Sequence, residues 1–238
     1  MSYYGFDKSD YPGDDVMQAW WTNSPFYFVG FYLAPAPNHP DNSWMNKRAT
    51  LKSQGWGFLP IYNGRQISDS NLTEQQGRTD AQNAATLARN AGFSYNTVIY
   101  LDIETGGTLP NNFLNYIKGW IDEIYHKTAE FYPGVYCSYY QTADQIKNYI
   151  GSSLGSITKF WVWNVNCPPS QGCNLNSTVP DPSGSGVSYA RAWQYAQSPK
   201  PSGISCTGYS DTQCNKTYGG HTLSVDLDIA TSKDPSVY

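Results

Sequence analysis

Short apolar segments alternate with segments of helical periodicity along the first 150 residues, and this alternation constrains the fold more than any other feature. The apolar segments are rich in β-branched and aromatic residues, as buried strands are. They cover residues 2–6, 26–33, 56–62, 98–101 and 135–138. Helical patterns cover residues 14–23, 43–54, 73–90, 110–130 and 142–150. Strand–helix alternation of this kind predicts a parallel sheet covered by helices.

The pattern changes after residue 150. Three more strands are predicted, at residues 160–165, 189–196 and 223–229, and the segments between them are loops rich in Pro, Ser, Gly and Asn. About eight strands in 238 residues predict one α/β domain over residues 1–238, a TIM-like barrel with five β/α units followed by three loop-connected strands. The alternative is a doubly wound open sheet. It is disfavoured because no glycine-rich phosphate turn follows the first strand.

Two carboxylates separated by one residue, Asp102 and Glu104, end the fourth predicted strand. Side chains alternate along a strand, so these two are predicted to share a face. Active residues of such barrels lie at the carboxyl ends of strands, and Asp7 and Asp226 also meet that condition. Because the first and eighth strands are neighbours in a closed barrel, the pattern predicts a cluster of four acids suited to acid–base catalysis.

An isolated Asp-x-Glu pair has a simpler explanation. One acid faces solvent or a metal, and the other binds backbone N–H groups. Four acids at matching strand ends reverse that preference, although any one of them could be structural. Asp228 shares a face with Asp226 by the same alternation. A divalent-metal-dependent hydrolase is a weaker alternative, since four acids could hold Mg²⁺ or Ca²⁺.

The composition narrows the class of partner. The formal net charge is -4 and there is no basic block, which argues against nucleic acid as a partner. Charged residues make up only 14% of the chain and aromatic residues 16%, a balance that suits a secreted protein whose aromatic rings stack on sugars. A tyrosine-rich core is the alternative explanation. No membrane span and no signal peptide is visible in the sequence.

Four of the five cysteines lie in two loops. Cys167 and Cys173 share one loop, and Cys206 and Cys214 share the other, so we expect two small loop-closing disulfides in an oxidising compartment. Cys137 lies in an apolar strand and is expected to be a buried free thiol. The cysteine spacings do not match those of zinc sites, and we expect neither a metal nor a cofactor.

Several aromatic and amide side chains fall near predicted strand ends and are candidates for stacking on sugars or binding them by hydrogen bonds. For each one alone, packing of the barrel is an equally good explanation. Strand alternation also prevents two adjacent residues from both facing inward. The candidates are Tyr32, Tyr62, Tyr136, Trp163, Trp193 and Gln194.

Short motifs along the chain occur in the order seen in glycoside hydrolase family 25, the muramidase-type lysozymes. They are Gly5-Phe6-Asp7, Tyr100 to Glu104, Gly134-Val135-Tyr136, Trp161-Val162-Trp163, Trp193-Gln194-Tyr195 and Val225-Asp226. The sequence resembles still more closely the related glycoside-hydrolase-like domains of unknown function, in the opening Gly-Phe-Asp, the stretch 48–62, the Ala-rich helix and the closing Val-Asp-Leu-Asp-Ile-Ala. The resemblance covers essentially the whole chain and implies the same barrel.

Residue by residue, the resemblance implies a substrate-assisted, retaining glycosidase. Glu104 would be the general acid, and Asp102 would orient or polarise the acetamido group of the substrate. Asp7 and Asp226 would complete the acidic floor of the site. Clustered carboxylates raise one another's pKa, which favours a protonated Glu104 near neutral pH. The chain departs from the muramidases at Asp228, where they more often carry a neutral amide.

These observations predict a secreted, muramidase-like glycosidase that acts as a monomer on an N-acetylhexosamine polysaccharide such as peptidoglycan. The alternative is a non-catalytic cell-wall or glycan-binding module built on the same barrel. Asp228 is counted among the candidate substrate-binding residues.

Overall fold

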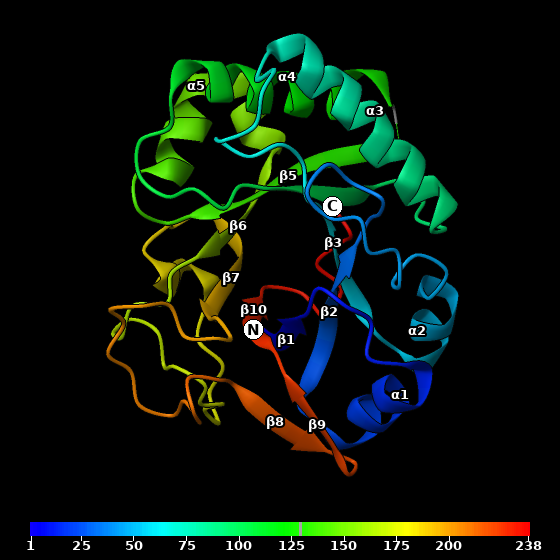
Figure 1. Ribbon diagram of the computed structural model, residues 1–238, viewed down its shortest axis with the longest axis vertical. Helices are drawn as coiled ribbons and strands as arrows, with labels where there is room; N and C mark the ends of the chain where they lie inside the picture. Colours follow the sequence, from blue (N-terminus) through cyan, green and yellow to red (C-terminus); the bar gives the residue numbers. More distant parts are fainter. Residues whose placement is uncertain (129) are drawn as a thin grey trace.

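The computed structural model describes residues 1–128 and 130–238 (Figure 1). Eight strands form a closed barrel in the order β1-β10-β7-β6-β5-β4-β3-β2, so the predicted α/β barrel is confirmed. The strands are β1 (Tyr3–Asp7), β2 (Phe26–Tyr32), β3 (Gly57–Tyr62), β4 (Thr97–Asp102), β5 (Phe131–Ser138), β6 (Lys159–Trp163), β7 (Ala190–Ala196) and β10 (Asp226–Ala230).

Five helices of the described residues follow the first five strands. They are α1 (Asp14–Asn23), α2 (Arg48–Gln54), α3 (Glu74–Asn90), α4 (Asn111–Lys127) and α5 (Thr142–Ile157). Figure 1 shows them around one side of the barrel, while loops cover β6, β7 and β10. The Thr73 side chain caps α3 by accepting a hydrogen bond from the Gln76 N–H, as the sequence predicts.

Three helix boundaries differ from the prediction. Helix α2 begins at Arg48 rather than near residue 43. Helix α4 ends at Lys127 rather than near residue 130, and residue 129 lies outside the described residues. Helix α5 continues past residue 150 to Ile157, through a kink at Gly151, where φ is 78°. Glycine adopts this left-handed conformation without the steric penalty of a side chain.

The sequence predicts a parallel sheet, but the eighth barrel strand is antiparallel to its two neighbours. Strands β1 to β7 pair in parallel, but β10 is antiparallel to both β1 and β7. Strand β7 ends at Ala196, and Ala196 pairs with Leu227 near the start of β10. Residues 197–225 contain no helical crossover that would return the chain to the other end of the barrel, so β10 runs antiparallel to β7. The predicted strand 223–229 is divided between β9 (His221–Ser224) and β10. Strand β9 forms a separate two-stranded hairpin with β8 (Asn215–Tyr218).

Apolar side chains form two layers, one inside the barrel and one between the barrel and its helices. Interior space is limited, and glycines on the strands make room for larger neighbours. A Cβ atom on Gly5 would overlap the ring of Phe28, and one on Gly30 would overlap the Asp7 side chain. Gly30 is therefore what allows Asp7 to point into the barrel.

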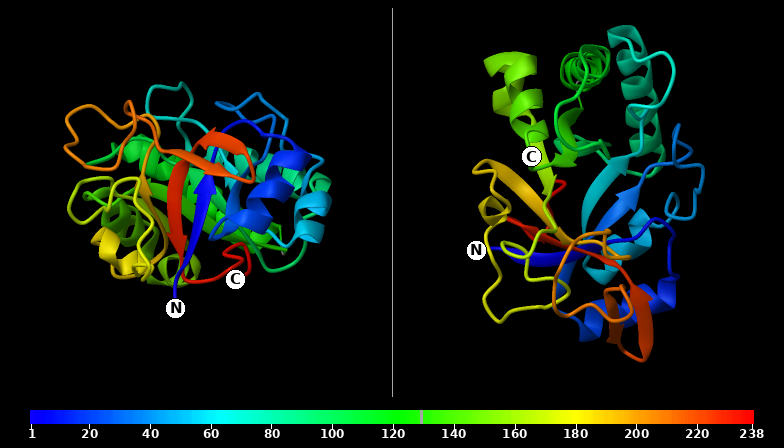
Figure 2. Two further views of the ribbon diagram at one scale, coloured as in Figure 1. Left: turned by 90° about the horizontal axis from the view of Figure 1, so that it is seen from below. Right: turned by 60° about the vertical axis from the view of Figure 1, so that its left-hand side comes forward.

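Both chain termini lie at one end of the barrel, and the long loops lie at the other (Figure 2). The start of β1 accordingly pairs with the end of β10, as Tyr3 with Ala230. No helix in the described part of the chain is long and apolar enough to cross a membrane.

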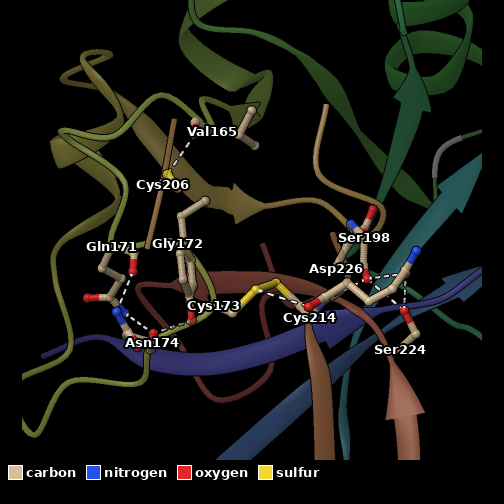
Figure 3. The surroundings of a disulfide bond; sticks show 12 residues. Val165, Gln171, Gly172, Cys173, Asn174, Ser198, Cys206, Cys214, Ser224 and Asp226 are labelled. Atoms are coloured by element: carbon tan, nitrogen blue, oxygen red, sulfur yellow. Dashed lines mark hydrogen bonds between the residues drawn. A yellow bond between two sulfur atoms is a disulfide. The ribbon is translucent and has the colours of Figure 1, made fainter. Parts of the chain in front are cut away.

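Two disulfides join the loop after β6 to the loop after β7, and Figure 3 shows one of them, Cys173–Cys214. They link Cys167 to Cys206 and Cys173 to Cys214, with Cα–Cα distances of 5.5 and 5.3 Å. The expected pairing within each loop is wrong, because the two loops lie side by side and each cysteine faces the other loop. Cys137 is buried on β5 and is free, as expected.

Candidate active site

A cavity of about 260 Å³ opens at the loop-bearing end of the barrel. Its wall contains the four acids predicted from the strand ends, so the fold brings them together: Asp7, Asp102, Glu104 and Asp226. The other lining residues are Tyr32, Ile61, Tyr136, Trp161, Gln194, Gln197, Ser198 and Pro199. A second hollow of about 220 Å³ shares Asp7 and Asp226 and extends toward Lys8 and Ser224.

Strand β4 positions Asp102 and Glu104. Asp102 is the last residue of the strand and is 2% exposed, whereas Glu104 lies beyond the strand end and is exposed at the mouth of the cavity. The prediction that both lie on the strand is therefore wrong for Glu104. The side chain of Gln66 holds this segment: its Nε2 donates to the Asp102 carbonyl (2.9 Å), and its Oε1 accepts from the Glu104 N–H (3.1 Å).

The electrostatics of this pair favour retention of a proton. Burial raises the pKa of Asp102 well above its ordinary value, and the nearby carboxyl groups of Glu104 and Asp7 raise it further. Partial removal from water also raises the pKa of Glu104, although its hydrogen bond with Asp102 opposes the effect. Asp102 Oδ1 is buried and has no hydrogen-bond partner among the described residues.

Asp7, on the opposite wall, is held by a hydrogen-bond network. Its Oδ1 accepts from the Tyr32 hydroxyl (2.8 Å), and its Oδ2 accepts from Gln194 Nε2 (2.8 Å). Gln194 Nε2 also donates to Asp226 (3.3 Å), while Gln194 Oε1 accepts from Tyr136 (2.7 Å) and Gln197 (2.9 Å). Burial raises the pKa of Asp7, and the bonds from Gln194 and Tyr32 oppose that rise.

Asp226 begins β10 and pairs directly with Asp7. It reaches the rim from the amino end of its strand, not from the carboxyl end as predicted, because β10 runs antiparallel. Burial and then Asp7 raise its pKa well above the ordinary value. The Ser198 N–H donates to Asp226 Oδ1 (2.7 Å), and the Ser198 hydroxyl accepts from the backbone N–H of Cys214 (2.8 Å). Figure 3 shows how this places the Cys173–Cys214 disulfide close to the loop that contacts Asp226.

The predicted sugar-binding side chains divide into two groups. Tyr32, Tyr136 and Gln194 line the cavity. Tyr62 and Trp193 face away from it, so the structure does not place these two in the site. The Tyr62 hydroxyl donates to Asn83 on α3 (3.0 Å), and Trp193 Nε1 donates to the Asn164 carbonyl (2.9 Å).

Trp163 lies at the rim against the loop containing Gly106, outside the set of cavity-lining residues. Trp161, two residues earlier on the same strand face, lines the cavity instead. Alternation from Trp163 could have identified it. Gln66, Gln197, Ser198 and Pro199 come from loops that carry no sequence pattern, so no signal pointed to them.

Asp228 lies beneath the cavity and outside its lining. It is fully buried, and its Oδ1 accepts a hydrogen bond from Trp161 Nε1 (2.9 Å). Among residues 1–128 and 130–238, no group of three or more His, Cys, Asp or Glu side chains is placed to hold a metal ion.

The profile of the Rv2525c-like, glycoside hydrolase-like domain matches residues 18–229. The chain belongs to this family. A curated relative, the uncharacterized protein FadG of Bacillus subtilis, is 32% identical over 108 residues, and the chain covers 18% of its length.

Solved structures similar to this Rv2525c-like chain share its barrel. An uncharacterized protein from B. stearothermophilus aligns over 99% of this chain and 100% of its own, with a TM-score of 0.69 and 19% identity. The spore cortex lytic enzyme SleM of Clostridium perfringens aligns over 96% and 67%, with a TM-score of 0.61 and 15% identity. The Tat-secreted protein Rv2525c of Mycobacterium tuberculosis aligns over 97% and 96%, also with a TM-score of 0.61 and 15% identity.

Proposed function

We propose that this protein hydrolyses glycosidic bonds in an N-acetylhexosamine polysaccharide such as peptidoglycan, with Glu104 as general acid and Asp102 assisting. The observation that carries the proposal is the presence of two neighbouring carboxyl groups, from Asp102 and Glu104, in the wall of one cavity. One of them, on Glu104, is open to solvent, and the other, on Asp102, has a buried oxygen without a hydrogen-bond partner among the described residues.

An acetamido group would complete this arrangement. Its N–H can donate to the unpartnered oxygen of Asp102, which favours the ionised form of Asp102. If the two carboxyl groups carry one proton between them, that proton then lies on Glu104. Glu104 then gives that proton to the leaving oxygen as the glycosidic bond breaks. The acetamido carbonyl oxygen bonds to the anomeric carbon in the same step, as in the substrate-assisted exceptions among glycosidases.

Water completes the reaction. The Glu104 carboxylate takes a proton from a water molecule, whose oxygen bonds to the anomeric carbon and releases the acetamido oxygen. Both carboxyl groups return to their starting protonation states. The carboxylate of Asp7, held by Tyr32 and Gln194, makes the opposite wall of the cavity negative, which favours the positive charge that develops on the sugar ring.

The proposed polymer and location draw on the relatives. SleM is described as a spore cortex lytic enzyme, and a similar barrel, the autolysin LytC of Streptococcus pneumoniae, is described in complex with a synthetic peptidoglycan ligand. Rv2525c is described as Tat-secreted, and two disulfides suit an oxidising compartment. We therefore place the protein outside the cytoplasm, in contact with cell-wall polysaccharide.

The test compares wild type with Glu104→Gln on purified cell walls, with released reducing ends as the readout. Removing a general acid lowers rate by about 10²–10⁴-fold, so we expect a loss in that range. Glu74→Gln is the matched control, because Glu74 pairs with Arg78 on the surface of α3, away from the cavity. Equal activity in wild type and Glu104→Gln would exclude the proposed role.

The alternatives give different results in the same assay. Binding to the polymer with no release of reducing ends over a broad panel would identify a glycan-binding module instead of an enzyme. Loss of activity on addition of a chelator would identify a metal-dependent hydrolase.

A further inference from the structure

Asp228 lies on the barrel floor below the proposed site and is fully buried. Trp161 Nε1 donates to one of its carboxyl oxygens, Oδ1 (2.9 Å). Its other oxygen, Oδ2, is buried and receives no hydrogen bond from a donor group in the described residues. A buried carboxylate with an oxygen that no donor contacts is unfavourable in its charged form.

Among the described residues, no positively charged group is one of the main influences on Asp228. The ionisable groups that act on it most strongly are Asp7 on β1 and Asp226 on its own strand, and both are acids. Gln194 of β7, its partner across the sheet, and Trp161 of β6 are neutral. No Lys, Arg or His of residues 1–128 and 130–238 lines the cavity above it. The further ionisable side chains nearby are Tyr100 and Tyr136, which pack on Trp161, and Tyr195 of β7.

A neutral carboxylic acid fits these contacts where a carboxylate does not. Its carbonyl oxygen accepts from Trp161, and its hydroxyl can donate to the carboxylate of Asp7, which lies on the neighbouring strand two residues beyond Gly5, the residue paired with Asp228. Burial, followed by Asp7 and Asp226, raises the pKa of Asp228 well above its ordinary value. A neutral amide can make the same two contacts.

We propose that Asp228 is a positioning residue that acts as a neutral hydrogen-bond donor and orients the Asp7 carboxylate at the base of the site. The proton on Asp228 thus takes the place of an amide N–H. The effect on turnover rests on the proposed glycosidase activity, but the protonation of Asp228 can be measured without it.

The first test is a pH titration of the aspartate carboxyl groups by carbon NMR, assigned with Asp228→Asn. We expect the Asp228 resonance to show a protonated acid well above pH 4, the range in which an unperturbed aspartate ionises. Asp41, which is exposed and accepts a hydrogen bond from the Ser43 N–H, serves as the control because its pKa is lowered. An Asp228 that ionises with or below Asp41 would overturn the proposal.

The second test compares the stability of variants across pH. The raised pKa of Asp228 means that wild type loses stability, relative to Asp228→Asn, as pH rises from about 4 through the native pKa. We therefore expect Asp228→Asn to be the more stable protein at neutral pH. Asp41→Asn should change in the opposite direction, because a lowered pKa favours the wild-type protein above about pH 4. An Asp228→Asn variant that is less stable than wild type at neutral pH contradicts the proposal.

The third test measures glycan cleavage against pH. Asp228→Asn should stay within about threefold of wild type at neutral pH and keep its activity further into the alkaline range, because its donor cannot ionise. Asp228→Leu should lose about tenfold or more, since Asp7 loses a donor. Equal losses in both variants would assign Asp228 a packing role only. If wild type cleaves no glycan, the proposed function fails, while the titration and stability results still decide the role of Asp228.

Discussion

The two walls of the cavity are built differently. On the β4 wall, Asp102 and Glu104 come from one short stretch of sequence, and a buried oxygen of Asp102 has no hydrogen-bond partner among the described residues. On the opposite wall, Asp7, Gln194 and Asp226 come from three strands, and hydrogen bonds connect them to one another and to neighbouring loops.

This difference separates two tasks. A group that performs chemistry must be able to engage the substrate, and the β4 wall supplies exposed Glu104 with the carboxyl group of Asp102 lining the cavity beside it. A group that shapes a site must be held in place, which the bonds on the Gln194 side achieve. We infer that the β4 wall reacts with the substrate and the opposite wall supports it.

Among the variants that test the difference between the two walls, Asp102→Asn should lose the most activity. The carboxylate that accepts the acetamido N–H is lost, and we expect turnover to fall by about 10²–10³-fold. The same variant should be more stable than wild type as pH rises above about 4, because the raised pKa of Asp102 makes the wild-type acid unfavourable once it ionises. Rates on cell walls and thermal unfolding across pH would check both. A variant that is slower and also less stable at neutral pH would indicate a supporting role instead.

Gln194→Ala should have an intermediate effect. Asp7 and Asp226 lose a shared donor, so we expect about 1–3 kcal/mol lower stability and a loss of activity of roughly tenfold. Urea unfolding and cleavage rates measure the two changes. Gln197→Ala is the control, because Gln197 contacts Gln194 and Tyr136 but neither carboxylate. If the Gln194→Ala loss of activity matches that of Glu104→Gln, the two walls do not divide their tasks as inferred.

A pair of Tyr→Phe variants should give the smallest effects and tests which side chains face the site. Tyr62→Phe removes the bond to Asn83 on the outer face of the barrel, so we expect a loss of about 1 kcal/mol in stability and unchanged turnover. Tyr136→Phe removes the donor to Gln194 within the cavity and should lower turnover a few-fold. Comparable kinetics in the two variants would contradict this assignment.

Much of the site could be predicted because strand alternation and the closure of a barrel are simple rules. They placed Asp7 and Asp102 on one rim and limited the pair Trp193 and Gln194 to one inward side chain. Asp226 reaches the same rim only because its strand runs antiparallel, which the rules did not predict. The same rules could not identify Tyr62 as outward, since its direction depends on the register of β3. Gln66 and Ser198 lay beyond prediction because loop backbones follow no periodicity.

The sequence by itself determined the barrel, its order of strands and helices, and the carboxylates near its rim, because hydrophobic periodicity is a local property that each segment carries alone. Only the tertiary structure decided the antiparallel direction of β10, the Cys167–Cys206 and Cys173–Cys214 pairing, and the environment of Asp228. Each of these depends on which distant segments meet. The protonation of a buried acid follows from its neighbours in space, not from its neighbours along the chain.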